Sequence, residues 1–152
     1  MLEKLQRLIK YCETIAVGRS DIPQPHIVAD KDQGTSVLNS PSIKGPQVVI
    51  SLPLASLSGD CDHIAGPFSF IIFALDKGAE QSRTQPQYVA QYLQTIELLD
   101  RLLGKFLSDM GGSASGESCP MLTGMEVAEC EIDPEAGIFG GWNGYSATIT
   151  LK

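Results

Sequence analysis

Residues 86–110, PQYVAQYLQTIELLDRLLGKFLSDM, decide the fold that the sequence predicts. Large apolar side chains recur there at steps of three and four, the period of an amphipathic helix. Pro86 is typical of a first helical turn, and Gly111-Gly112 provides a stop. At 1.5 Å per residue the helix is about 35 Å long, enough to cross a whole sheet. The residues expected on its buried stripe are Val89, Tyr92, Leu93, Ile96, Leu99, Leu103, Phe106, Leu107 and Met110, widened by Leu98 and Leu102.

Apolar runs on both sides of this helix predict strands. Residues 48–52 form one strand, and residues 68–75 carry bulky apolar groups on both alternations, which indicates cover on both faces. Residues 127–133 alternate acidic and apolar side chains, with Cys130 among the buried ones. Residues 142–151 alternate in the same way, and residues 134–141 form the turn before them.

The N-terminal part supplies a second helix. Residues 2–17 place leucine and isoleucine at helical spacing, and Gly18 ends the pattern. Strands grouped on either side of one long helix predict an α+β fold. We expect a mixed, mainly antiparallel sheet packed against the long helix and the N-terminal amphipathic helix.

The 152 residues amount to one domain, residues 1–152. A long Pro/Gly-rich loop is predicted at about residues 19–46, with one short strand at His26–Ala29. Its polar part, Asp30–Lys44, is expected to be loop with at most an edge hairpin. Residues 111–118 are predicted to be a flexible Gly/Ser segment.

The charge balance excludes several classes of function. The chain carries 11 Lys and Arg against 18 Asp and Glu, a net charge of −7. Sequence-specific nucleic-acid binding needs a dense basic surface, so it is not expected. No apolar run reaches the length of a membrane span, so we expect no membrane association.

The cysteines predict reduced thiols. The chain has four, Cys12, Cys61, Cys119 and Cys130, and no CxxC pair. Without such spacing a zinc ribbon or a redox pair has no support. Cys12 lies on the apolar stripe of the first helix, so we expect Cys12 and Cys130 to be small core residues.

One cluster could carry chemistry. Asp60-Cys61-Asp62-His63 places two carboxylates, a thiol and an imidazole together. A metal site would need a further ligand from another part of the chain, and the spacing of the other ligand-type residues does not indicate one. A solvated loop is therefore the prediction, and we assign no catalytic, cofactor-binding or metal-binding residue. The acidic residues from Glu126 to Glu135 are read as a solvated strand face, or as a surface that repels nucleic acid.

The order of elements resembles the small virion proteins of bacteriophages and prophages, in particular tail terminator (tail-completion) proteins of long-tailed phages. The resemblance lies in the N-terminal helix, the long loop, the two apolar strands and the long helix. It also lies in the closing strand GGWNGYSATITL, residues 140–151.

The resemblance implies a non-enzymatic structural protein that needs no cofactor. Such proteins form a homo-oligomeric ring, commonly a hexamer, at the head-proximal end of the tail tube. Their partners are the tail tube and head-connector proteins. The resemblance also implies assembly in the host cytoplasm and a final place in the virion tail. Two alternatives stay open: a small cytosolic protein-binding adaptor that uses the long helix, and a metal-dependent enzyme that uses Asp60, Asp62 and His63.

Overall fold

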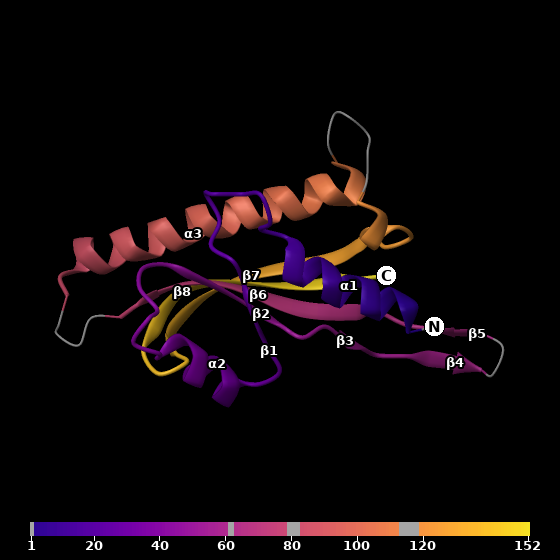
Figure 1. The fold of residues 1–152 in the computed structure, drawn as a ribbon, viewed down its shortest axis with the longest axis horizontal. Helices are drawn as coiled ribbons and strands as arrows, with labels where there is room; N and C mark the ends of the chain where they lie inside the picture. The colour runs from indigo at the N-terminus through magenta and orange to yellow at the C-terminus, as the bar shows by residue number, and fades with distance from the viewer. Residues whose placement is uncertain (1, 61–62, 79–82, 113–118) are drawn as a thin grey trace.

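The computed structural model describes residues 2–60, 63–78, 83–112 and 119–152, and it has the predicted α+β architecture (Figure 1). Its helices are α1 (Glu3–Thr14), α2 (Lys31–Leu38) and α3 (Gln85–Leu107), with a π-helical turn at Ser108–Gly112 and a 3-10 turn at Pro120–Leu122. Its strands are β1 (His26–Val28), β2 (Gln47–Ser51), β3 (Leu54–Ala55), β4 (Ser58–Asp60), β5 (His63–Ala65), β6 (Phe68–Lys77), β7 (Val127–Ile138) and β8 (Trp142–Leu151).

A mixed sheet in the order β1-β2-β6-β8-β7 forms the centre of the molecule. Only the β1–β2 pair is parallel among the described strands, and the other pairs are antiparallel. β3 extends the β2 ladder along β6 beyond Pro53, which lacks the N–H that a continuous ladder needs. The mainly antiparallel sheet is therefore confirmed.

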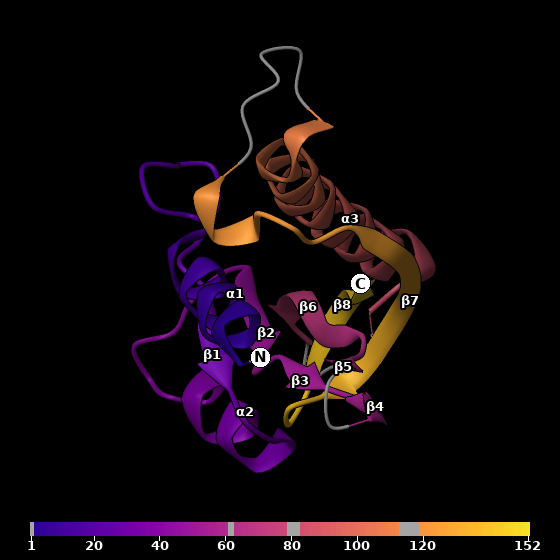
Figure 2. The ribbon, with the colours of Figure 1, turned by 90° about the vertical axis from the view of Figure 1, so that its right-hand side faces the viewer.

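Two helices cover one face of this sheet. Figure 2 shows α1 and α3 on the same side, with β7 beyond α3 at the sheet edge. The main core lies beneath them, because every second residue of β2, β6 and β8 points to this face. Its fully buried members include Leu8, Ile50, Ile72, Leu99, Leu102, Phe106, Ile149 and Leu151.

The long helix confirms the strongest prediction, but its buried stripe differs from the expected one. Thr84 and Gln87 form a capping box at its start, with Pro86 in the first turn. Leu98, Leu99, Leu102 and Phe106 face the core, and so do Gln91 and Thr95. Val89, Leu93 and Leu107 are exposed by 42%, 58% and 51%, so the assignment of these three to the core was wrong.

Two polar side chains account for that difference. The Gln91 amide donates to the Lys77 carbonyl at 2.8 Å, and the Thr95 hydroxyl donates to the Tyr92 carbonyl at 2.8 Å. A buried polar group with a hydrogen-bond partner carries little penalty. The helix can therefore turn a stripe that includes polar residues toward the sheet.

The predicted loop Asp30–Lys44 contains α2, which the sequence pattern does not announce. Asp30 is its N-cap, and its carboxylate accepts from the Gln33 backbone N–H at 2.8 Å. Leu38 is buried with Val28, Val49, Leu75, Phe139 and Trp142 in a second, smaller cluster on the other face of the sheet. That packing stabilises a helix whose own sequence is a poor helix former.

The last hairpin is longer than predicted. β7 continues through Pro134 to Ile138, where residues 134–141 were expected to be a turn. Proline is tolerated there because β7 is an edge strand. Cys130 is exposed, which corrects its assignment to the core, whereas the core position of Cys12 is confirmed.

Candidate functional site

Two of the residues that could have carried metal chemistry, Asp60 and His63, lie on paired strands. β4 and β5 pair antiparallel and bring the backbones of Asp60 and His63 opposite each other. Cys61 and Asp62 lie outside the described residues. Within the described part of the chain, no group of three or more metal-ligating side chains comes together.

The face of the sheet opposite α1 and α3, here called the open face, is covered only in part. α2 and Phe139 cover its end at Val49, Leu75 and Trp142. On the uncovered part of this face, the chemical character of the side chains changes from one strand to the next. One row runs from Ile71 through Thr148 to Glu131, and the next runs from Phe73 through Ser146 to Asp133. The open face is thus apolar along β6, neutral and polar along β8, and acidic along β7.

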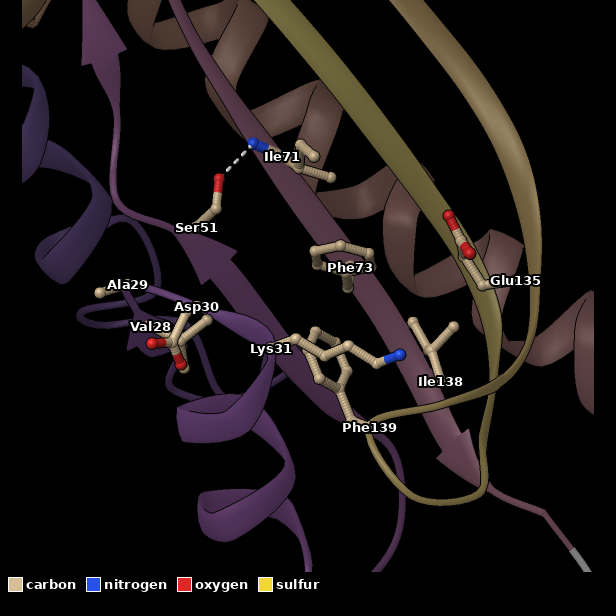
Figure 3. Close-up of a pocket in the computed structure, with 10 residues that line it drawn as sticks. All are labelled: Val28, Ala29, Asp30, Lys31, Ser51, Ile71, Phe73, Glu135, Ile138 and Phe139. Atoms are coloured by element: carbon tan, nitrogen blue, oxygen red, sulfur yellow. Dashed lines mark hydrogen bonds between the residues drawn. The ribbon is translucent and has the colours of Figure 1, made fainter.

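A cavity of about 360 Å³ lies in the apolar half of the open face. Figure 3 shows its walls, which come from β1, β2, β6, the start of α2 and the β7–β8 hairpin. The rings of Phe73 and Phe139 meet edge to face with their centroids 5.2 Å apart. The lining residues are Val28, Ala29, Asp30, Lys31, Ser51, Ile71, Phe73, Glu135, Ile138 and Phe139.

Local sequence explains how Phe139 reaches this position. It has a positive φ of 48°, which turns the chain between β7 and β8. A Cβ atom at Gly34 would overlap the Phe139 ring, so only glycine leaves room for the ring against α2. The Asn39 side-chain amide holds the same turn by donating to the Phe139 carbonyl at 2.7 Å.

Three polar groups of the cavity already have structural roles. The Ser51 hydroxyl accepts from the Ile71 N–H at 2.8 Å, and Glu135 accepts from the Ser146 hydroxyl at 2.8 Å. The Asp30 carboxylate caps α2. Lys31 extends from the start of α2 toward Ile138 (Figure 3). This arrangement fits an apolar group held below a charged rim, which is a binding function.

The acidic stretch of the sequence becomes a row on the open face. Glu129, Glu131 and Asp133 occupy alternate positions of β7, opposite Thr150, Thr148 and Ser146 of β8. None of the three has an ion-pair partner within the described residues. A solvated strand face was the prediction, and all three side chains are exposed. Together with Glu135 they give this edge of the sheet a strong negative potential.

A partly buried polar network ties α1 to the last turn of α3 and the π-helical turn that follows it. The Tyr11 hydroxyl donates to Asp109 at 2.7 Å, and the Lys105 ammonium lies 2.7 Å from the same carboxylate. Burial raises the pKa of Tyr11, and the hydrogen bond to Asp109 raises it further. The network satisfies charges next to the core and serves the fold.

The thiols are expected to differ in reactivity. Burial raises the pKa of Cys12 from 9.0 to about 12, so little reactive thiolate forms near neutral pH. We expect a disulfide reagent to modify exposed Cys130 in native protein and Cys12 only after unfolding. Denatured protein without reductant should yield all four thiols, counted by absorbance and assigned by peptide mapping. A count of two or zero would reveal a disulfide.

The same shift in pKa sets the sign of a pH effect. The unfolded thiol ionises near its ordinary pKa of 9.0, well below the native value. The stability that depends on the protonated Cys12 is therefore present below about pH 9 and lost as the pH rises toward 12. Tyr11, whose pKa is also raised, contributes in the same direction.

Comparison of the sequence with protein families and curated sequences gives no relative. No protein-family model matches the chain, and no curated protein sequence matches it. None of the described helices has the length and apolar character needed to cross a bilayer. The geometry of the open face, rather than a relative, has to support any function.

Proposed function

We propose that this chain is a non-enzymatic structural protein of a long-tailed bacteriophage or prophage. It resembles tail terminators, and it assembles as a homo-oligomeric ring at the end of the tail tube or at the head–tail junction. The tail tube and the head connector are its partners in this role, and the virion tail is its final location.

The division of the open face into an apolar and an acidic half carries this proposal. The apolar half presents Ile71, Phe73 and the cavity, and Leu54 of β3 lies beside it with 56% of its surface exposed. Leu54 pairs with Ser69 of β6, so its side chain shares the open face with Ile71. An exposed apolar surface of this kind marks a protein contact.

A ring needs a contact between two different patches of successive subunits. The apolar half of the open face supplies one patch, and the acidic half on β7 stays beside it. With the row from Glu129 to Glu135 directed toward the lumen, a ring would repel the phosphates of passing DNA. The acidic charge of the chain thus supports a channel through which DNA moves without binding.

The test is assembly of the purified protein. Wild-type protein is expected to form rings by electron microscopy and to limit the length of tail tubes assembled in its presence. Leu54→Asp should abolish rings, because it places a charge in the apolar patch. Val17→Asp is the matched control, since Val17 is 65% exposed in the turn that follows α1. A wild-type protein that forms no ring and leaves tube length unchanged contradicts the proposal.

A further inference from the structure

The outward side of α3 carries a second apolar stripe, here called the outer stripe: Val89, Leu93, Ile96, Asp100, Leu103 and Leu107. Their spacings alternate between four and three residues, which is the 3.5-residue repeat of a helix–helix seam. Val89, Leu93 and Leu107 are about half exposed, and Ile96 and Leu103 are half-buried. Ile96 and Leu103 pack against the margin of the main core, whereas Val89, Leu93 and Leu107 lie farther from the sheet.

The sheet beside the outer stripe is also uncovered. Cys130 and Ile132 of β7 pair with Ile149 and Ala147 of β8, which places them on the same face as α3. Ile132 is nevertheless 42% exposed. A helix is about 10 Å wide and strands are about 4.8 Å apart, so one helix covers about two strands. The Tyr92 hydroxyl of α3 reaches β7 by donating to the Glu135 carbonyl at 2.8 Å. The part of β7 at Cys130 and Ile132 nevertheless stays exposed.

Together these observations describe the place of a missing helix. A helix lying along α3 above β7 would bury Leu93 on one side and Ile132 below, and would complete the helical layer. We propose that this surface binds an amphipathic helix of a partner protein, with apolar residues in heptad spacing and a Lys or Arg facing Asp100. This inference does not depend on ring assembly, which uses the other face of the sheet.

Asp100 determines the charge of the partner. It is exposed in the middle of the outer stripe, and within the described residues it has no hydrogen-bond or ion-pair partner. A single polar residue in an apolar seam sets which helix can pair with it and in which register. A basic side chain in the facing layer would neutralise Asp100, whereas an acidic one would leave two like charges desolvated.

The same residue argues against a second copy as the occupant. Two outer stripes paired antiparallel over their full length place Asp100 of each copy opposite Ile96 of the other. Parallel pairing in register brings the two Asp100 carboxylates together. In both arrangements the carboxylate is desolvated without a basic partner, which is costly. The outward side of α1 is polar, with Glu3, Gln6, Lys10 and Glu13 exposed, and α2 has only eight residues. Neither α1 nor α2 therefore offers an apolar seam with a central basic residue.

The experiment uses two synthetic helical peptides of about 24 residues, a little over three heptads. Both carry leucine at the seam positions, and they differ only in Lys or Glu at the layer that faces Asp100. Fluorescence anisotropy with the full chain should show the Lys peptide binding at least about tenfold more tightly. Asp100→Lys should reverse this preference, and Leu93→Glu should remove binding of both peptides. Val17→Glu is the matched control and should leave the preference unchanged.

Circular dichroism checks that each variant is folded. If Leu93→Glu does not fold, Asp100→Lys still tests the proposal, because Asp100 is exposed and its replacement should not disturb the core. Equal binding of the two peptides, or a preference that Asp100→Lys leaves unchanged, overturns the proposal. Concentration-dependent dimers in sedimentation that Leu93→Glu abolishes also overturn it, because a second copy would then occupy the surface.

Discussion

Leu99→Ala is expected to lower the free energy of unfolding by about 2–5 kcal/mol, because it removes buried methyl groups and leaves a cavity. Leu99 is fully buried between α3 and the sheet. The loss combines the transfer free energy of the removed atoms with the contacts that their neighbours can no longer make. Urea unfolding followed by circular dichroism measures it.

Leu107→Ala on the same helix provides the control. Leu107 is 51% exposed on the outer stripe, so its replacement should cost about 0.5 kcal/mol or less. Leu103 is half-buried, and its variant should fall between the two. If Leu99→Ala and Leu107→Ala cost the same, the two stripes of α3 are not distinct, and the inner stripe is not the core.

For the long helix, some properties could be predicted from the sequence and others could not. Its existence and length follow from periodicity alone, and the structure confirms both. Its orientation does not follow, because apolar residues occupy more than half of its circumference. The buried side includes Gln91 and Thr95, whose polar groups are satisfied by hydrogen bonds, and hydrophobicity does not encode these bonds.

The second helix was missed for a different reason. Residues 31–38, KDQGTSVL, include Gly34 and Thr35, which disfavour helix in isolation. The N-cap signal of Asp30 was present but weak in a segment rich in polar residues. Burial of Leu38 and the contact of Gly34 with Phe139 favour the helix, and these contacts join parts of the chain about a hundred residues apart.

The sequence likewise predicts one part of the candidate site and not the other. The acidic row on β7 could be read from the alternation of Glu129, Glu131 and Asp133. The cavity could not, because Val28, Phe73 and Phe139 meet only when the β7–β8 hairpin folds back against α2. The one available signal was the strand at residues 68–75, whose second apolar face needed cover that the predicted helices did not supply.

The centre of the sheet makes a strict steric demand on one residue, Gly144 of β8. It pairs with Leu75 of β6, and a Cβ atom at this position would collide with the carbonyl oxygen of Ala74. Gly144→Ala must push β6 and β8 apart where they form the middle of the sheet. We expect a loss of about 3 kcal/mol or more, at or above the upper end of ordinary overpacking, because backbone cannot move aside as a side chain can.

Gly104→Ala is the matched substitution with the opposite sign. Gly104 lies in α3 on an exposed side, and a Cβ atom there meets nothing within 4 Å. Alanine should therefore stabilise the protein by about 1 kcal/mol, the difference in helix propensity between the two residues. Guanidinium unfolding of both variants against wild type measures the two effects in one experiment. A Gly144→Ala variant as stable as wild type would mean that β6 and β8 do not approach as closely as the register requires, and the open face built on those strands would lose its basis.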